Sequence, residues 1–371
     1  MPQDVEPAVA DALAPLLGHL VEVRGSDLFV KAGSVPRVRV DGRLEPTPFA
    51  APDPGSIDRL VQMLMPANRG DELAAVGATD FAVGISGVGR FRVHVYRQRG
   101  TLGVVIRQVM PGIPSWESLG LPPVVDRLAA AGSGLVLVTG PAGSGKTTTL
   151  NAVVDHINTS RAVHVVTVED PIEYLHTDKQ SIISQREVGS DTPSLAEGLQ
   201  RALRQAPDVL VVGHLADLDT LDAAFAAVAS GQLVLASVAT TTASDTLTRL
   251  IEWFPPHLQT QARHQLASAL RAVLAQRLLE RADGNGRIAA VEVLVNTPKV
   301  EDCIRQDAGE AVLAQLITDG RYHGMQGFDQ ALFGLCREGL VSQRDALTAA
   351  SDPEELKLEL QQAGLTAAHS G

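Results

Sequence analysis

Cysteine and aromatic residues are scarce in this chain. Only two cysteines, Cys303 and Cys336, occur among its 371 residues. Their spacing matches neither a CxxC pair nor a zinc motif, so we expect buried thiols in a reducing cytoplasm rather than a disulfide framework. Aromatic residues make up 4% of the chain, which is too few for the stacking platforms that hold single-stranded nucleic acid.

Long apolar runs and an excess of positive charge are also missing. No apolar stretch approaches the roughly 20 residues that a membrane-spanning helix needs. The start, MPQDVEPAVADALAPL, lacks the basic region of a signal peptide. The formal net charge of −12 argues against broad nucleic-acid binding, although it leaves room for a local basic patch. We therefore expect a cytoplasmic protein without a nucleic-acid partner.

The first part of the chain, residues 1–112, has the pattern of a small α+β domain. Apolar residues recur at helical spacing from Val9 to Leu20, and short strand-like runs punctuated by Gly and Pro follow. The predicted strands cover residues 27–31, 35–40, 81–85, 90–97 and 101–109.

The rest of the chain, with a length that allows a second full core, has a different pattern. Residues 113–123 are rich in Pro and Gly and indicate a linker. Residues 124–300 alternate strands with helices, which is typical of an α/β domain with a mostly parallel sheet, whereas residues 301–371 have a helical pattern. The predicted strands cover 135–139, 163–169, 208–213 and 232–238, and a late amphipathic helix is predicted from Leu266, Leu270, Val273, Leu274 and Arg277.

The most informative motif is GPAGSGKT at residues 140–147. It fits GxxxxGK[ST], the phosphate-binding P-loop, and it lies where that motif must lie, between a buried strand and a helix. The glycines let backbone N–H groups curl around phosphate oxygens. Lys146 adds a point charge for the β- and γ-phosphates, Thr147 offers a hydroxyl to Mg²⁺, and the helix N-terminus adds its dipole. The predicted cofactors are ATP and Mg²⁺, and the predicted nucleotide-binding residues are Gly140, Pro141, Ala142, Gly143, Ser144, Gly145, Lys146, Thr147 and Thr148.

A second motif, VEDPIEY, follows about twenty residues later. A strand ends there and delivers Glu169, Asp170 and Glu173 at its carboxyl end, where ligands of open α/β sheets bind. These carboxylates are candidates to hold the water shell of Mg²⁺ or to take a proton from an attacking water. The alternative is that these carboxylates belong to a solvated turn after a strand, which Pro171 ends.

These motifs, together with several others, resemble the type IV pilus retraction ATPases of the PilT/PilU kind, within the secretion-ATPase superfamily. The first domain contributes GSDLFVKAGSVPRVRVDGRL (25–44) and GVGRFRVHVYRQRG (87–100). The second contributes QREVGSDTPSLAEGLQRALRQAPDVLVVG (185–213) and SALRAVLAQRLL (268–279). GMQGFDQAL (324–332) and SDPEEL (351–356) match near the end, so the resemblance covers nearly the whole chain.

The resemblance implies a PAS-like N-terminal domain, a RecA-like P-loop motor domain and a helical C-terminal region. It further implies a ring of six subunits, with ATP bound between the two domains, located at the cytoplasmic side of an inner-membrane pilus or secretion platform. Glu173 would be the general base. Arginines of a neighbouring subunit commonly complete such sites, and the candidates are Arg90, Arg92, Arg97 and Arg107. The alternative for each of them is a solvated charge on a strand.

Four positions depart from the family pattern. The family's GExRD reads GHLAD here, so His214 replaces a glutamate expected to position a Mg²⁺-bound water, and Ala216 replaces an arginine. The family's histidine box reads SGQLVLASVATTTA, with Gln232 and Ala239 in place of the two histidines. A neutral imidazole has no charge to offset Mg²⁺. We expect Gln232 to retain a hydrogen bond to a γ-phosphate, which Ala239 cannot make.

Three hypotheses follow. The first is a hexameric, Mg²⁺-dependent ATPase motor that retracts pili, with hydrolysis weakened by the four substitutions. The second is a catalytically impaired, nucleotide-binding paralogue that joins a competent partner in a mixed ring. The third is a DNA-translocating ATPase, which the acidic net charge and the whole-chain resemblance disfavour.

Overall fold

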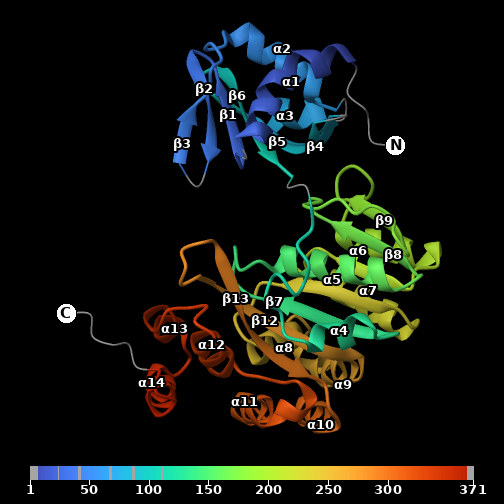
Figure 1. Cartoon of the computed structure of the whole chain (residues 1–371). Coiled ribbons are helices and arrows are strands. Elements are labelled where there is room, and N and C mark those ends of the chain that lie inside the picture. Colours follow the sequence, from blue (N-terminus) through green and yellow to red (C-terminus); the bar gives the residue numbers. More distant parts are fainter. Residues whose placement is uncertain are drawn as a thin grey trace. The chain divides into compact units, whose positions relative to one another are not determined.

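The computed structural model describes residues 7–23, 25–40, 43–66, 69–85, 88–109 and 112–365. The chain divides into two compact units, residues 1–112 and 113–371 (Figure 1). None of the helices within the described ranges is long and apolar enough to cross a membrane.

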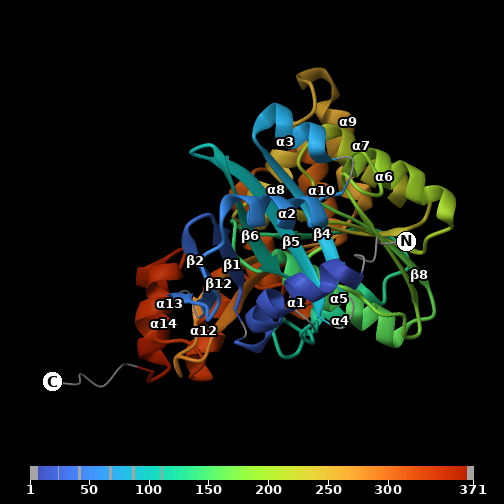
Figure 2. The ribbon, with the colours of Figure 1, turned by 90° about the horizontal axis from the view of Figure 1, so that it is seen from above.

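The first unit is a six-stranded antiparallel sheet with its helices on one face (Figures 1 and 2). Buried residues alternate along the strands, as in Phe91, Val93 and Val95, and they pack against Leu17, Leu20 and residues of the other two helices. The strand order is β3-β2-β1-β6-β5-β4. The elements are α1 (Pro7–Glu22), β1 (Asp27–Lys31), β2 (Ser34–Val40), β3 (Arg43–Pro46), α2 (Pro54–Leu64), α3 (Gly70–Val76), β4 (Ala78–Ile85), β5 (Gly89–Gln98) and β6 (Thr101–Gln108).

The five strands predicted in this unit are confirmed, but three elements were not predicted. All four residues of β3 are exposed, so this strand has none of the apolar alternation that identifies a half-buried strand. Helix α2 does carry a helical pattern, with Ile57, Val61 and Leu64 buried, and the sequence analysis missed it. Helix α3 has seven residues and buries only Leu73, which leaves no periodic signal.

The second unit contains a mixed seven-stranded sheet of order β13-β12-β7-β11-β10-β8-β9. The four predicted strands are confirmed as β7, β8, β10 and β11, which run parallel with their carboxyl ends at one edge. β12 is parallel to β7, and only the pairing of β12 with β13 is antiparallel. The strands are β7 (Gly134–Thr139), β8 (His164–Glu169), β9 (Ile182–Glu187), β10 (Val209–Val212), β11 (Leu233–Val238), β12 (Leu270–Glu280) and β13 (Arg287–Val295).

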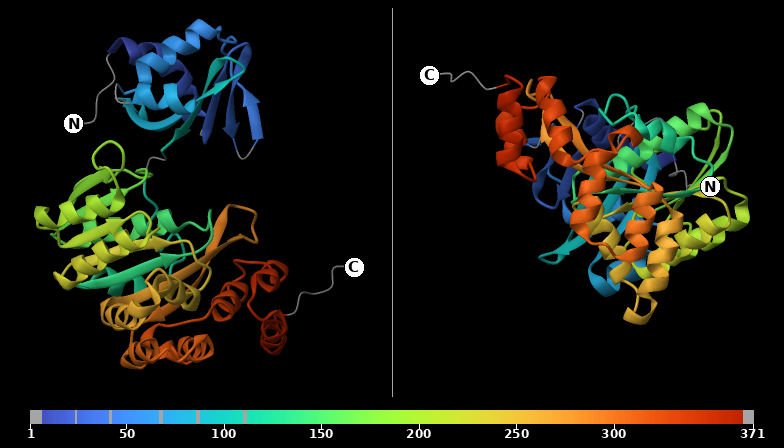
Figure 3. Two further views of the ribbon diagram at one scale, coloured as in Figure 1. Left: turned by 180° about the vertical axis from the view of Figure 1, so that it is seen from behind. Right: turned by 90° about the horizontal axis from the view of Figure 1, so that it is seen from below.

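Helices cover both faces of this sheet (Figure 3). On one face α4 and α5 bury Val125, Val154 and Ile157 against the strands, and on the other face α6 to α11 bury residues such as Leu199 and Leu250. The helices are α4 (Val124–Ala129), α5 (Lys146–Ser160), α6 (Leu195–Ala202), α7 (Leu218–Ala229), α8 (Ala243–Glu252), α9 (Gln259–Ala269), α10 (Pro298–Gln306), α11 (Glu310–Asp319), α12 (Phe328–Arg337), α13 (Gln343–Ala349) and α14 (Pro353–Gln362).

The helix predicted across residues 266–277 is wrong. Helix α9 ends at Ala269, and Leu270, Val273, Leu274 and Arg277 belong to β12. Most of β12 is buried on both faces, so its apolar residues occur at nearly every position and satisfy helical spacing by coincidence.

The helices α12, α13 and α14 gather beside the β12–β13 end of the sheet around a small separate core (Figure 3). Arg277 connects β12 to this group, because its guanidinium lies 4.0 Å from the centre of the Phe328 ring and donates to the carbonyl of Ala349. The helical pattern predicted after residue 300 is confirmed in the described residues. Both cysteines are buried free thiols, as predicted.

Residues 113–123, predicted as a linker, contain no helix or strand. However, Leu121 is 5% exposed and belongs to the core between the sheet and helices α4 and α5. Trp116 and Leu119 pack against that core. This segment therefore belongs to the second unit.

Candidate nucleotide-binding site

The phosphate loop, residues 140–147, connects β7 to α5 at the carboxyl edge of the parallel strands. Gly140, Gly143 and Gly145 have φ angles of 152°, 77° and 89°, a region that side chains disfavour. A Cβ atom on Gly140 would also collide with Ser144 and would lie 2.6 Å from the carbonyl oxygen of Gln276. The loop therefore needs its glycines for both conformation and space.

The first turn of α5 is open to an anion. The residue before the helix, Gly145, provides no side-chain cap for the N–H groups of that turn, which leaves these donors for a ligand. Lys146 donates from Nζ to the carbonyls of Gly140, at 2.8 Å, and Pro141, at 2.9 Å. Burial lowers the pKa of the Lys146 ammonium, and the nearby carboxylate of Glu173 opposes this shift.

The residues present fit a nucleotide phosphate and its Mg²⁺. The buried hydroxyl of Ser144, inside the loop, has no hydrogen-bond partner within the described part of the chain. Thr147 lies in the first turn of α5, where its hydroxyl can take one Mg²⁺ position. No group of three or more His, Cys, Asp or Glu side chains in the described ranges is arranged to hold a metal. Apart from the Thr147 hydroxyl, any Mg²⁺ here would depend on phosphate and water oxygens.

The three predicted carboxylates differ in their surroundings. Glu169, at the end of β8, is 4% exposed, and its Oε1 accepts from Thr167 at 2.7 Å and from Gln185 at 3.1 Å. Burial raises the pKa of Glu169. Asp170 and Glu173 are exposed. Glu173 is therefore the predicted carboxylate that combines solvent access with an electrostatic influence on Lys146.

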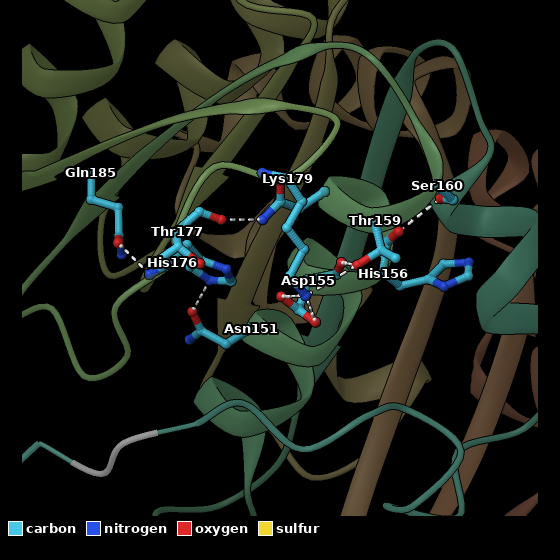
Figure 4. A network of polar contacts seen from close by, with 10 residues as sticks. Asn151, Asp155, His156, Thr159, Ser160, His176, Thr177, Lys179 and Gln185 are labelled. Atoms are coloured by element: carbon cyan, nitrogen blue, oxygen red, sulfur yellow. Dashed lines mark hydrogen bonds and ion pairs between the residues drawn. The ribbon is translucent and has the colours of Figure 1, made fainter.

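A hydrogen-bonded chain connects α5 with the segment that carries Glu173 (Figure 4). Asn151 donates to the carbonyl of Thr147 at 2.9 Å, and its Oδ1 lies 2.8 Å from Nε2 of His176. The backbone N–H of His176 donates to Oε1 of Gln185, whose Nε2 donates to the carbonyl of Tyr174 and to Glu169. The segment after β8 is thereby held between α5 and β9.

Contacts further along α5 hold the same segment. Asn158, fully buried, donates to the carbonyl of Thr177 at 2.8 Å and accepts from the N–H of Lys179 at 3.0 Å. The Lys179 ammonium contacts both carboxylate oxygens of Asp155 at 2.8 Å (Figure 4). Thr148 and Tyr174 add a hydroxyl pair at 3.0 Å, so Thr148 contacts this segment as well as following the phosphate loop.

His214 follows β10 at the same sheet edge, and its neighbours fix its position. The N–H of Leu215 donates to the carbonyl of Ser237 at 2.8 Å, and the Ser237 hydroxyl donates to the carbonyl of Gly213 at 2.6 Å. Burial lowers the pKa of His214, and the ammonium of Lys146 lowers it further. The imidazole is therefore neutral at pH 7 and close to the phosphate-loop lysine.

Of the other three substituted positions, Ala216 and Ala239 follow strands at the same sheet edge as His214, whereas Gln232 does not. Ala239 follows β11 beside the end of β7, and Ala216 is exposed two residues after His214. Gln232 instead precedes β11, and its carbonyl accepts from the N–H of Gly134 at the opposite end of β7. The six residues of β11 separate Gln232 from the phosphate-loop edge, a distance of roughly 20 Å at the usual rise of a strand. Gln232 therefore lies at the edge opposite the phosphate loop of its own chain, and the predicted hydrogen bond from Gln232 to a γ-phosphate stays a prediction.

Known proteins resemble this chain in both sequence and fold. The family described as "Type II/IV secretion system protein" matches residues 122–335. The Pseudomonas aeruginosa protein "Type IV pilus ATPase PilU" is 39% identical over 344 residues, which cover 92% of this chain and 90% of PilU. The "Type IV pilus retractation ATPase PilT" of the same organism is 36% identical over 342 residues, covering 92% and 99%. The chain belongs to the PilT/PilU-like type IV pilus ATPases.

A solved structure of this family agrees with the described fold. "Crystal Structure of the Pilus Retraction Motor PilT and Bound ADP" superposes with a TM-score of 0.85 at 38% identity and covers 92% of this chain and 98% of that one. The α/β fold predicted for the chain, with a smaller N-terminal unit and an ATPase unit, is confirmed.

The four arginines suggested as candidates for this chain lie on β5 and β6. Arg107 donates to Asp27 at 2.7 Å, and Arg92 lies 3.7 Å from Asp80. Arg92 is directly opposite Arg107 across the strands. Arg90 alternates with buried Phe91 and so shares the outer face with Arg92, whereas Arg97 is exposed near the end of β5.

Several polar residues of the site were missed by the sequence analysis. Asn151, Gln185 and Gln276 carry no charge and were assigned no role, although Gln185 and Gln276 lie in segments 185–213 and 268–279, which carry the family resemblance. The signal that could have singled out Gln276 is an isolated Gln in the apolar strand β12, an unusual residue for that place. Two cavities, of about 280 and 300 Å³, lie among the helices that follow β11, and the phosphate loop lines neither of them.

Proposed function

We propose that this chain is an ATP-binding, Mg²⁺-dependent motor of the pilus retraction and secretion ATPase family whose hydrolysis is slow. The observation that carries this proposal is the combination of a complete phosphate loop with a neutral His214 close to Lys146. The loop supports ATP binding, whereas His214 occupies the position at which the family has an acid.

Each residue has a stated task in this proposal. Lys146 exchanges its two loop carbonyls for phosphate oxygens, and the free N–H groups of α5 donate to the same phosphates. Glu173 accepts the proton of the attacking water. Mg²⁺, with Thr147 as one ligand, supplies positive charge against the phosphates. His214 adds no negative charge to orient a Mg²⁺-bound water, so turnover is slow.

The assembly proposed for this chain is a ring of six subunits at the cytoplasmic face of an inner-membrane pilus or secretion platform. The functional regions would be the PAS-like residues 1–112, the motor residues 124–300 and the helical residues 301–371. A neighbouring subunit would supply one or more of Arg90, Arg92 and Arg97 to the phosphates. Arg107 is a weaker candidate, since its guanidinium already pairs with the buried carboxylate of Asp27.

A second candidate function is a nucleotide-binding paralogue that turns over poorly and joins a competent motor in one ring. The clustering of His214, Ala216 and Ala239 at one sheet edge supports this reading, since a single chemical step would be affected while binding is retained.

Calorimetry, a steady-state ATPase assay and light scattering on the purified chain test these proposals. We expect Mg-ATP to bind with micromolar affinity, a turnover well below that of a competent family member, and a particle of six subunits. Absence of ATP binding would contradict the central proposal. Normal binding with no measurable turnover, restored in a mixed ring, would favour the paralogue. A monomer at high concentration, with and without nucleotide, would contradict the ring.

A further inference from the structure

Gln276 lies beside the phosphate loop although it comes from a different strand. β12 pairs with β7 in parallel register, with Ala275 opposite Thr139. The residue after Ala275 is Gln276, still in β12, and the residue after Thr139 is Gly140, the first residue of the phosphate loop. Gln276 and Gly140 are therefore neighbours. Gln276 is 1% exposed, an unusual degree of burial for a glutamine.

Both ends of the Gln276 amide bind the loop and its helix. Nε2 donates to the carbonyl of Ser144 at 2.5 Å. Oε1 accepts from the hydroxyl of Thr149, in the second turn of α5, at 2.9 Å. The amide thus spans from the middle of the phosphate loop to the helix that follows it.

Two glycines of the loop pack against the same residue. A Cβ on Gly140 would lie 2.6 Å from the carbonyl oxygen of Gln276, and a Cβ on Gly145 would lie 3.1 Å from its Nε2. Gln276 therefore contacts the loop at its start, its middle and its end. A buried amide must be paired whatever its role. What sets Gln276 apart is that its two partners are the phosphate loop and the helix that follows the loop.

We infer that Gln276 is a positioning residue, which holds the phosphate loop in its anion-binding shape before ATP arrives. This inference rests on the proposed use of the loop as the phosphate site. Gln276 itself touches no phosphate. It fixes the carbonyl of Ser144 away from the anion and so leaves the loop N–H groups facing it. Loss of the Gln276 amide should weaken the binding of any polyphosphate, whether or not the polyphosphate carries adenosine.

The test replaces Gln276 by methionine, which has a similar length and no amide. Gln276→Met should weaken both Mg-ATP and tripolyphosphate binding by about tenfold, measured by calorimetry. The matched control is Gln326→Met, since Gln326 is a half-buried glutamine of the same unit whose Nε2 donates to the carbonyl of Val291. This control should keep the wild-type affinities. Equal affinities in wild type and Gln276→Met would overturn the inference.

A second pair of variants covers the case in which Gln276→Met does not fold. Thr149→Val removes the hydroxyl that anchors Oε1 and should weaken tripolyphosphate binding several-fold. Thr149→Ser keeps the hydroxyl and should bind more tightly than Thr149→Val. Equal affinities in these two variants would count against the inference.

Hydrogen exchange of the ligand-free protein separates this inference from the proposed function. Amides of residues 140–147 should exchange faster in Gln276→Met than in wild type and Gln326→Met. If the wild type binds no ATP, the proposed function fails, but the exchange rates still decide the role of Gln276. Unchanged exchange rates of residues 140–147 in Gln276→Met would overturn the inference.

Discussion

The two sides of the phosphate loop, which follows β7, are built differently; β12 is the neighbour of β7 on one side, and β10 lies beyond β11 on the other. We call them the β12 flank and the β10 flank. On the β12 flank, Gln276 is buried, uncharged and paired at both ends of its amide. On the β10 flank, His214 is half-buried and has an imidazole whose pKa is lowered by burial and by Lys146. We infer that the first flank fixes the shape of the loop, and we propose that the second decides which side chain faces the phosphate. Because the flanks belong to different strands, a substitution on one can leave the other intact.

The largest expected effect comes from the loop itself. Lys146→Ala removes the charge that both flanks surround, and it should weaken Mg-ATP binding by at least about 100-fold in calorimetry. Lys179→Ala is the control, because that ammonium pairs with Asp155 on α5 and has no contact with the phosphate loop. Similar losses in both variants would mean that general charge, rather than the loop, attracts the nucleotide.

His214→Glu should change the β10 flank alone. The backbone around position 214 is fixed by the bonds of Gly213 and Leu215 to Ser237, so a glutamate would start from the same place. We expect kcat to rise by about 100-fold with little change in KM, because the restored carboxylate acts mainly in the transition state. Steady-state ATPase kinetics measure both constants.

Two further variants test whether this gain is due to the proposed chemistry. Glu173→Ala in the His214→Glu background should be inactive, since the proton acceptor is then missing. Adding Ala239→His and Ala216→Arg should increase kcat further and non-additively if the groups act as one site. If the natural chain hydrolyses ATP rapidly and His214→Glu leaves kcat unchanged, the two flanks do not control binding and hydrolysis separately.

A smaller effect is expected from His176, which connects α5 to the segment carrying Glu173. Burial lowers the pKa of His176 to about 4, with Asp155 opposing and Lys179 adding to the shift. Its Nδ1 has no hydrogen-bond partner in the described part of the chain. The unfolded chain therefore binds this proton near pH 6.5 and the folded chain only near pH 4, so stability falls as pH is lowered through that range.

The expected loss is about 2 kcal/mol in the free energy of unfolding between pH 7.5 and pH 5. Urea denaturation at the two pH values measures it. His176→Gln should remove this part of the acid sensitivity and can still donate to Asn151. The control is His156→Gln, since His156 lies on α5 and contacts Asp126. This variant should retain the wild-type dependence of stability on pH. An unchanged pH dependence in His176→Gln would place the acid-sensitive group elsewhere.

The parts of the fold that could be predicted are those with one dominant local signal. The strands of the parallel sheet are short apolar runs with turns at each end, and the phosphate loop is identified by its glycines and Lys146. Ser194, three residues before Glu197, has the spacing of a capping box, and its hydroxyl does accept from the N–H of Glu197 at the start of α6. The carboxylate of Glu197 pairs with Arg201 instead.

The remainder depends on contacts between distant segments. β12 was predicted as a helix because a strand buried on both faces has no alternation. β9 is an edge strand with mixed burial, and its pairing with β8 cannot be derived from its own residues. Gln232 was placed beside Ala239 because both belong to one motif, although a whole strand separates them. Gln276 meets Ser144 across 132 positions of sequence, a pairing that only the sheet order creates.

Successive residues of a strand point to opposite faces, and in β12 this gives Gln276 and Arg277 two different neighbours. Gln276 binds the phosphate loop, whereas Arg277 stacks on Phe328 and donates to Ala349 among the C-terminal helices. The loop and these helices therefore share one strand as a common support. The loop and these helices should therefore unfold locally in one cooperative event rather than two. A ligand that stabilises the loop should then also increase the hydrogen-exchange protection of α12 and α13.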